Sequence, residues 1–499
     1  MIRGLGLPLS RLDARRQMKQ LVAARPVGLT VILVLAGALS GCEREEASQY
    51  AGCTAINHVT VIDPSAPAGQ SLRPNQTVLI CGDRIRSVGS ARGVGTPKGA
   101  RGVDGSGKFL IPGLWDMHVH LSAVGTSSAP LFLAFGVTSV RDCGSEFGVL
   151  QDWRSQISAG TLAGPRIMGA GAVLESQRFL EAVNKIAGKL EPDLGKSLRE
   201  IIRGRIGVTS VADAKARVDS LKAKGADFIK VRNAESPEIL YAIAEEAKKD
   251  SLPLAGHVIR GADLAKASEA GQTSVEHDED FLDSKPAPIT PKQRTELGAE
   301  FARNGTVLVP TIVARRSRLA PDREIQAVLK DTVGTTDPMR RYLSPELLHF
   351  WKVNVALKKF DEREEGWESK LQKGEDFVRA MRETGVEVLP GTDLGVPLLY
   401  PGTSLLEELG IFVDELGMTP LQALNSATVL PARWFGLGGQ LGTIAPGKLA
   451  DLVLLDANPL EDIRHLRQVA GVMANGRYVD RTHLDRLLAE IASPASVRR

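Results

Sequence analysis

The sequence predicts an α/β fold: a (β/α)8 TIM barrel joined to a small β-sandwich domain that is built from both termini. Two observations support this prediction. Short apolar segments alternate with helical patterns through the middle of the chain, and eight such units imply a parallel sheet that closes into a barrel. Strand-like segments separated by Pro and Gly residues occur near both ends of the chain. The expected boundaries are 1–41 for a signal peptide, 42–110 for the first part of the β-sandwich domain, 111–437 for the barrel, and 438–499 for the second part of that domain with a terminal helix.

The first 41 residues have the pattern of a bacterial lipoprotein signal peptide. Basic residues precede the apolar run "VGLTVILVLAGALSGC", which is too short for a convincing membrane-spanning helix. Its last four residues resemble a lipobox, in which Cys42 would carry the lipid. We therefore expect an exported protein, lipid-anchored in the cell envelope, in the outer membrane facing the periplasm. An uncleaved anchor with a chance cysteine is the alternative.

Export would expose the remaining cysteines to an oxidising compartment, where disulfides persist. Cys53 and Cys81 flank two strand-like segments that could pair as a hairpin. A Cys53–Cys81 disulfide and two unpaired buried thiols are both open at this stage.

Composition excludes some partners. The 499-residue chain has a formal net charge of only +3, so it lacks the electrostatic footprint of a nucleic-acid-binding protein. With 43% hydrophobic and 24% charged residues, it is an ordinary globular composition. The lipid anchor is the one membrane contact expected, and a homo-oligomer stays open.

The elements follow from local signals, taken in chain order. Residues 54–63 and 76–89 alternate in polarity and carry β-branched residues, and residues 442–459 and 469–479 repeat this pattern near the C-terminus. The strands expected in the barrel are 110–116, 137–142, 165–170, 228–231, 253–258, 273–276, 306–311 and 386–393.

Helical patterns separate these strands, and two longer stretches interrupt this alternation of strands and helices. In "SPEILYAIAEEAKKD", Ser236 is an expected N-cap and Pro237 the first helical residue. Residues 172–206 and 312–375 are charged helical insertions that would leave the C-terminal face of the barrel. For the longer one, a lid, a dimer contact and solvated decoration are all open.

Histidines gather at the predicted strand ends. Because residues i and i+2 of a strand face the same side, His118 and His120 can both enter one site. His257, His277 and Asp393 end three other strands. Each alone could be a hydrogen-bonded or capping residue. Together they lie where a parallel barrel converges its catalytic groups, which predicts a metal site.

Other polar residues complete this interpretation. Lys230 lies in an apolar strand, where an ordinary ion pair is the alternative to a site role. Asp116 is in phase with the first histidine pair and could support it. The remaining histidines are interpreted as structural or surface residues: His58, His349, His465 and His483.

The ordered phrases "FLIPGLWDMHVH", "GVTSVRDCG", "GADFIKV", "AGHV", "SVEH" and "GTD" resemble the amidohydrolase superfamily, specifically its imidazolonepropionase-like and Xaa-Pro dipeptidase (prolidase)-like members. The resemblance spans residues 54–480. It implies one or two divalent metals, usually zinc, with His118 and His120 on the first and His257 and His277 on the second. The ligand positions it implies are His118, His120, Lys230, His257, His277 and Asp393.

In dipeptidase-like members the equivalent of Lys230 is carboxylated and bridges two metals, while Asp393 would exchange a proton with the nucleophilic water. The resemblance therefore implies a binuclear metal-dependent amidohydrolase that hydrolyses a dipeptide (Xaa-Pro or another hydrophobic dipeptide) or an N-acyl amino acid through a metal-bridging hydroxide. A mononuclear cyclic amidohydrolase similar to imidazolonepropionase and a non-catalytic binding lipoprotein are the alternatives.

Candidate substrate contacts are fewer. A basic residue just after Lys230 could receive a substrate carboxylate, and the basic residue after the second strand could contact substrate or brace the site. The loop "GAGAVLESQRF" lacks the "GGHG"-like pattern of many relatives, so contacts from that loop do not transfer. The candidates are Arg141, Arg232, Tyr241 and Thr311.

Overall fold

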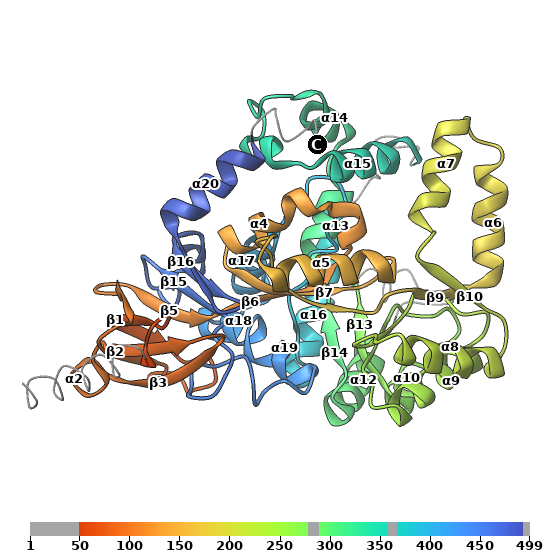
Figure 1. Cartoon of the computed structure of the whole chain (residues 1–499). Coiled ribbons are helices and arrows are strands. Elements are labelled where there is room, and N and C mark those ends of the chain that lie inside the picture. The colour runs from red at the N-terminus through yellow and green to blue at the C-terminus, as the bar shows by residue number, and fades with distance from the viewer. Residues whose placement is uncertain (1–48, 278–288, 358–366, 493–499) are drawn as a thin grey trace, which may run out of the picture. The chain divides into compact units, whose positions relative to one another are not determined.

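The computed structural model describes residues 49–277, 289–357 and 367–492 (Figure 1). The expected signal peptide and Cys42 lie outside the described residues. The chain divides into a small unit, residues 1–52 with 97–100, and a large one, residues 53–96 with 101–499. The large unit carries the sheet, the barrel and the candidate site described below. Within the described residues, no helix is long and apolar enough to cross a membrane.

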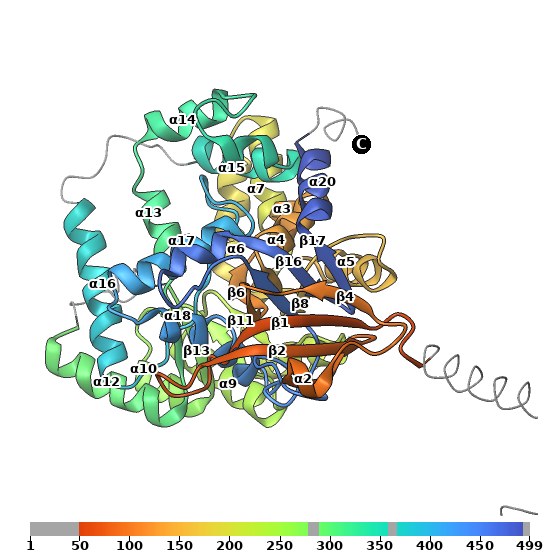
Figure 2. The same cartoon turned by 90° about the vertical axis from the view of Figure 1, so that its left-hand side faces the viewer.

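One sheet is built from both ends of the chain, as predicted for the small β-domain (Figure 2). β15 pairs antiparallel with β5, and this pairing joins the C-terminal strands to the N-terminal ones. β1 forks, because its first half pairs with β4 and its second half with β5. The strands of this sheet are β1 (Thr54–Ile62), β2 (Leu72–Cys81), β3 (Arg84–Ser90), β4 (Arg101–Asp104), β5 (Phe109–Pro112), β15 (Leu452–Leu455), β16 (Val469–Ala474) and β17 (Arg477–Asp480).

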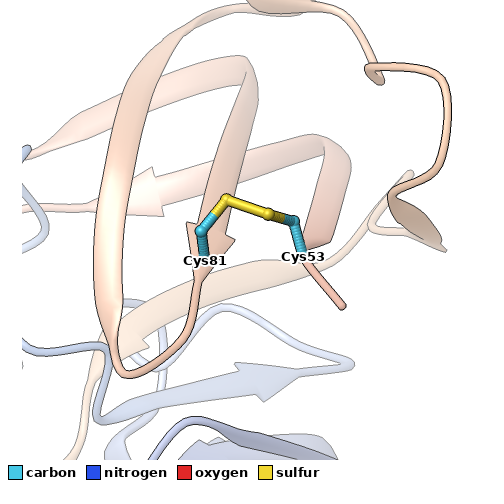
Figure 3. Close-up of a disulfide and its surroundings, with 2 residues drawn as sticks. All are labelled: Cys53 and Cys81. Atoms are coloured by element: carbon cyan, nitrogen blue, oxygen red, sulfur yellow. A yellow bond between two sulfur atoms is a disulfide. The ribbon is translucent and has the colours of Figure 1, made fainter. Parts of the chain in front are cut away.

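A disulfide joins Cys53, which precedes β1, to Cys81, the last residue of β2 (Figure 3). The two Cα atoms are 4.3 Å apart, because β1 and β2 are antiparallel neighbours. Of the two alternatives left open by the sequence, the disulfide is the one found. Cys143 is a free, buried thiol.

The barrel consists of parallel strands. One ladder joins β6 to β7 and β8, and another runs from β9 through β11 and β12 to β13 and β14. Asp227 N donates to Gly169 O at 3.0 Å between the two ladders. The strands are β6 (Leu114–Val119), β7 (Val137–Asp142), β8 (Arg166–Gly169), β9 (Val173–Ser176), β11 (Ile229–Val231), β12 (Leu254–Gly256), β13 (Gln272–Glu276) and β14 (Val307–Val309).

β8 and β9 follow one another between β7 and β11 and share the third position of the ring, so residues 386–394 occupy the eighth. This segment is not a continuous strand, but Val388 bridges Leu308 and Leu394 bridges Val119, both in parallel. It therefore completes the ring between β14 and β6.

The first predicted strand, 110–116, needs a correction. It spans two strands of different sheets: β5 belongs to the β-domain and β6 to the barrel, with Gly113 between them. A Cβ atom at Gly113 would collide with the Thr138 side chain, so the chain passes from one sheet to the other where a larger residue does not fit. The apolar sequence runs on through β5 and β6, so it carries no local sign of the change of sheet.

Helices surround the barrel strands. The predicted helix after β11 is α9, and it begins at Pro237 with Ser236 as N-cap. The barrel and C-terminal helices are α4 (Ala129–Ala134), α5 (Phe147–Ala159), α8 (Val211–Ala223), α9 (Pro237–Lys249), α10 (Leu264–Ala270), α12 (Pro291–Asn304), α16 (Trp367–Glu383), α17 (Thr403–Asp414), α18 (Pro420–Ser426), α19 (Val429–Trp434) and α20 (Arg481–Ile491). Short elements are α2 (Ala91–Val94), α3 (Leu121–Val124), η1 (Thr126–Ser128) and η3 (Ile463–Arg467).

The first insertion is a helical hairpin, α6 (Gln177–Ala187) and α7 (Pro192–Ile201), which returns to the sheet as β10 (Arg205–Val208). Figure 1 shows it as a pair of long antiparallel helices beyond the sheet. We refer to these two helices as the α6–α7 hairpin.

The second insertion is shorter than 312–375. α13 (Ile312–Arg318) starts in the barrel core, where Ile312 and Val313 are buried and Glu408 accepts both backbone N–H groups at 3.0 and 2.7 Å. α16 packs against α12 as a barrel helix. The true excursion is α14 (Asp322–Lys330), η2 (Pro338–Tyr342) and α15 (Pro345–Leu357).

Candidate metal centre

Three residues at strand ends adopt left-handed backbone conformations. His277, Thr311 and Asp393 have φ values of 64°, 51° and 53°. Non-glycine residues rarely hold this conformation, which costs about 1–3 kcal/mol and concentrates at functional sites. Backbone hydrogen bonds hold two of them, from His277 N to Val309 O at 2.9 Å and from Asp393 N to His118 O at 2.8 Å.

Asp393 meets the predicted histidine pair. Its Oδ1 lies 3.2 Å from Nε2 of His120 and 3.5 Å from Nε2 of His118. His118 is fully buried, whereas the His120 side chain is 30% exposed. The structure thus brings together two nitrogens and one oxygen that could hold a cation.

His257 and His277 continue this group. The ring centroids of His118 and His277 are 4.9 Å apart, and those of His277 and His257 are 4.7 Å apart. The Thr311 hydroxyl lies 2.7 Å from Nδ1 of His277, which fixes the ring and leaves Nε2 as its other nitrogen. Four imidazoles from three strand ends therefore form one contiguous cluster.

Two buried polar atoms fit a bound metal. Within the described residues, neither Nζ of Lys230 nor Nε2 of His118 has a hydrogen-bond partner, although both atoms are buried. An unsatisfied buried polar atom costs about 1–3 kcal/mol, so such atoms call for a ligand. Divalent metals bind neutral imidazole nitrogens, and a carboxylated lysine would offer oxygens. The donor set accordingly fits the metal that the sequence predicts.

The electrostatics favour neutral histidines. Burial lowers the pKa of His118 to about 4, and the charge of Lys230 adds to this effect. The pKa of His257 is lowered well below its usual value by the same two causes, and burial also lowers that of His277. At neutral pH these rings are uncharged, which is the form that binds metals.

Glu276 is a site residue that the sequence interpretation missed. Its Oε2 lies 2.7 Å from Nδ1 of His118, so it orients the ring and directs Nε2 toward Asp393. A carboxylate behind a ligand histidine is a common arrangement in metal sites. Burial alone would raise the pKa of Glu276, but Arg141 and Lys230 outweigh burial and hold it well below its usual value. A glutamate ending an apolar barrel strand, directly before His277, was the available signal.

Arg141 braces this carboxylate. Nη2 donates to both oxygens of Glu276, at 2.8 and 2.6 Å, and Nη1 donates to Ser274 Oγ at 3.1 Å. The guanidinium has no exposure and lies 4.9 Å from the centroid of the Trp434 ring. The sequence left two roles open for Arg141, contact with substrate and bracing of the site. The contacts found here are those of a bracing residue.

Asp116 ties strand one to strand eight. The carboxylate is fully buried and accepts from Thr392 N at 3.0 Å, Thr392 Oγ1 at 2.7 Å and His118 N at 3.2 Å. Burial raises its pKa to about 7. It therefore supports the backbone beneath His118 and next to Asp393.

Arg318, at the end of α13, forms an ion pair with Oδ2 of Asp393. Burial would raise the pKa of Asp393, but its contact with His120 and the charges of His277 and Arg318 hold it well below its usual value. Nothing in the text "ARRSRLA" distinguished Arg318 from its neighbours.

Tyr241 and Arg232, two of the predicted substrate contacts, have other partners in this structure. The Tyr241 hydroxyl accepts from Asp263 N at 2.8 Å, and the ring packs in a separate hydrophobic cluster around α9. Arg232 pairs with Glu175 at 3.2 Å, at the next strand edge. The structure does not bring either residue into contact with the histidines.

A cavity of about 340 Å³ adjoins His120. Both insertions wall it: the α6–α7 hairpin contributes Ser197 and α15 contributes His349 and Phe350. His349 was interpreted as structural or surface, but it lies in the cavity wall, with Nε2 3.4 Å from Ser197 Oγ. The site therefore opens toward the insertions.

A closed parallel barrel whose strand ends gather histidines, a lysine and an aspartate defines a class of barrel hydrolase. The model of the amidohydrolase family matches residues 109–479, and the chain belongs to that family. It is a hydrolase acting on the C–N bond of amides, in a family that is generally metal-dependent.

Individual relatives agree with this assignment. The ochratoxinase of Aspergillus niger is 26% identical over 404 residues, which cover 73% of each chain. The crystal structure of a Xaa-Pro dipeptidase with methionine bound in its active site has a TM-score of 0.60 and 23% identity, over 86% of this chain and 100% of that one. The bottromycin amidohydrolase has a TM-score of 0.66 and 22% identity, over 94% of both. The two structures establish the shared fold.

Proposed function

We propose that this chain is a binuclear metal-dependent amidohydrolase that cleaves a dipeptide (Xaa-Pro or another hydrophobic dipeptide) or an N-acyl amino acid. One observation carries the proposal: the amine of Lys230 is buried without a hydrogen-bond partner among the described residues, within electrostatic reach of both His118 and His257. An ammonium group on Lys230 is an unfavourable neighbour for the two histidines. A carboxylated Lys230 would instead bind the two metal ions together with these histidines.

The residues divide into two ligand groups. His118, His120 and Asp393 would hold one ion, and their ligand atoms already lie within 4.8 Å of one another. His257 and His277 would hold the second. The carboxylated Lys230 would contact both, and zinc suits this nitrogen and oxygen set.

Carboxylation follows from the surroundings of Lys230. The neutral amine forms a new N–C bond with carbon dioxide and releases one proton to solvent, which yields a carbamate with two anionic oxygens. Lys230 is 2% exposed, so the carbamate would be enclosed in the barrel beside the histidines.

The bound ions would supply an acidified water and polarise the scissile carbonyl. Asp393 would accept a proton from the attacking water and deliver it to the leaving nitrogen, as a base and then an acid. Glu276 and Thr311 keep the rings of His118 and His277 oriented meanwhile. The cavity beside His120 receives the substrate.

We further propose that Cys42, outside the described residues, anchors the mature protein by lipid in the outer membrane facing the periplasm. The Cys53–Cys81 disulfide supports an oxidising compartment. Labelling with radioactive palmitate should mark the wild-type protein and not C42A. Equal labelling of both would contradict the anchor.

Metal analysis and a substrate screen test the proposed activity. The purified protein should contain two zinc ions per chain and hydrolyse members of a library of Xaa-Pro dipeptides, other hydrophobic dipeptides and N-acyl amino acids. K230M should lose the second ion and most activity. K222M is the matched control, because Lys222 is an exposed lysine paired with Asp250 on the outside of α8.

One zinc per chain in a fully active enzyme, unaffected by K230M, would contradict the binuclear proposal and favour the mononuclear alternative. A metal-loaded chain with no turnover of any library member would contradict the proposed substrate class.

A further inference from the structure

One helix, α15, touches the loops that follow two of the proposed metal ligands. The Glu346 carboxylate lies against Gly125, where even a Cβ atom would collide with it, and Gly125 ends α3 in the loop after β6. The ring of Phe350 packs against Gly395, two residues after Asp393. Both side chains also line the cavity. α15 therefore lies across the open side of the metal centre.

The side of α15 that faces the cavity follows from helical spacing. Residues i, i+3, i+4 and i+7 of a helix share one side. The residues of α15 that line the cavity have this spacing: Glu346, His349, Phe350 and Val353. This side of the helix offers a carboxylate next to an aromatic ring.

Buried contacts hold α15 in place. Ser344, directly before the helix, is buried, and its hydroxyl donates to Val124 O at the end of α3. Trp351 is also buried, and its ring centroid lies 5.4 Å from that of Tyr400. Glu346 is therefore presented by a fixed backbone, and a ligand that binds it does not have to order a loop.

The charges in the cavity wall are nearly balanced. The lining residues that carry a charge are Glu146, Glu200, Glu346, Arg203 and Arg205. Glu146 and Glu200 lie 3.7 and 3.9 Å from the guanidinium of Arg203, so two carboxylates face this one cation.

Arg205 already has an anionic partner. Its Nη1 lies 2.9 Å from Oε2 of Glu175, a fully buried carboxylate that Arg232 also contacts at 3.2 Å. The wall therefore offers no unpaired cation near Glu346.

Glu346 differs from the other charged residues of the wall because no cation faces it. Across residues 49–277, 289–357 and 367–492 its carboxylate has no ion pair and accepts no hydrogen bond, and the residue is exposed. Ammonium groups bind carboxylates through charge-assisted hydrogen bonds and aromatic faces through cation–π contacts. Glu346 and Phe350 together supply both kinds of contact, beside the metal centre.

We propose that Glu346 binds an ammonium group of the substrate, so that the enzyme prefers a substrate with such a group to one of the same skeleton without it. This inference rests on the proposed function and adds a charge requirement to it. If the group is the α-amine, the preference selects dipeptides over N-acyl amino acids, two classes that the proposed function leaves open. A side-chain amine offers the same chemistry, and the test separates the two sources.

The test uses two pairs of substrates at pH 7, each pair differing by one amino group. L-Alanyl-L-phenylalanine and propionyl-L-phenylalanine differ in the α-amine. L-Lysyl-L-phenylalanine and L-norleucyl-L-phenylalanine differ in the side-chain amine. All four carry the same carboxylate, so its recognition cancels within each pair. Release of phenylalanine gives kcat/KM, and the thermal unfolding midpoint in a D393N background reports binding without turnover.

The wild-type enzyme should prefer the ammonium-bearing member of at least one pair. E346Q should reduce that preference about 10-fold, mainly through KM, because a neutral amide replaces the carboxylate. E346D retains the charge on a shorter side chain and should keep part of the preference. Zinc content should stay at the wild-type value in both variants.

E368Q is the matched control. Glu368 is the exposed second residue of α16, as Glu346 is of α15, so both changes remove the same interaction with a helix dipole. Glu368 does not line the cavity. E368Q should therefore keep the wild-type preference in both pairs.

An E346Q enzyme that keeps the wild-type preference in both pairs would overturn this inference alone. So would equal losses for the two members of each pair, because Glu346 would then support the cavity without recognising charge. A reduced preference in one pair identifies which amine binds. Absence of turnover across the whole dipeptide and N-acyl library would overturn the proposed function. In that case, a midpoint shift by an ammonium-bearing ligand that E346Q abolishes would still support the ammonium site.

Discussion

The two sides of the metal centre differ in nearly every physical property. On one side His118, Glu276 and Arg141 are fully buried and joined by hydrogen bonds. On the other side His120 is partly exposed and borders a cavity walled by the two insertions. The buried side is built from barrel strands, whereas the open side depends on loops and inserted helices.

The comparison shows how one fold separates chemistry from specificity. Polar groups on the buried side have little room to move, because each lost hydrogen bond leaves a charge unpaired in a low-dielectric environment. Residues on the open side can change without that penalty. We therefore expect substitutions on the buried side to affect stability and metal binding, and those on the open side to affect KM.

The largest effect is expected at Asp393, which contacts both sides. D393N keeps an oxygen for the metal but loses the base, so kcat should fall about 10²- to 10⁴-fold. Steady-state kinetics with matched zinc analysis measure this. D376N, a change at an exposed aspartate paired with Arg379, is the control. Unchanged turnover in D393N would exclude the proton-transfer role.

Glu276 should come next. E276Q leaves Arg141 buried opposite a neutral group, and breaking a buried pair costs about 3–5 kcal/mol in unfolding free energy. Zinc affinity should fall about 10- to 100-fold, because His118 loses its orienting carboxylate. Denaturant unfolding and metal titration measure the two effects.

A matched pair of variants sharpens this prediction. E276M/R141M removes both charges and should be less destabilised than the sum of the single changes. E146Q, at a half-exposed ion pair on the open side, should change stability by less than about 1 kcal/mol. Equal losses of unfolding free energy in E276Q and E146Q would show that the buried and open sides do not differ.

A smaller effect is expected at Phe350 in the cavity wall. F350A removes an aromatic contact worth about 1 kcal/mol, so KM should rise about fivefold while zinc content stays at the wild-type value. Kinetics on the best library substrate measure KM. A loss of zinc instead would mean that α15 supports the metal centre.

The smallest effect concerns Cys143, on the buried side. Burial raises the pKa of its thiol to about 12, so at pH 8 very little thiolate is present for alkylation. Iodoacetamide should leave Cys143 unmodified in the folded protein and modify it in guanidinium, as peptide mass spectrometry would detect. S122C places a thiol at an exposed cavity residue and should react when folded. Rapid labelling of Cys143 would show that the buried side opens.

Much of the buried side could be predicted from the sequence. Apolar strands ending in His118, His277 or Asp393 are local signals, and parallel topology dictates that such ends converge. The structure brings those residues together. The first predicted strand, 110–116, was wrong because β5 and β6 form one uninterrupted apolar segment of sequence. No local signal marks the change of sheet at Gly113.

Contacts between distant segments could not be predicted in the same way. Arg318 reaches Asp393 through α13, a helix whose direction depends on packing, and Arg205 reaches Glu175 through the pairing of β10 with β9; neither contact follows from local propensity. His349 has no distinguishing neighbour in the chain, yet α15 carries it into the cavity wall. Glu276 was accessible in principle, since a buried carboxylate requires a partner.

The Cys53–Cys81 bond affects how the protein should be produced. It closes a loop with a sequence separation of 28, and cross-links of that size contribute about 3 kcal/mol to stability. A reducing host cytosol would yield chains without the cross-link, while a secretory route would yield chains with it. Two preparations with identical catalytic strands could then differ in shelf life and heat tolerance. Reducing agents in a purification buffer would have the same effect as the wrong compartment.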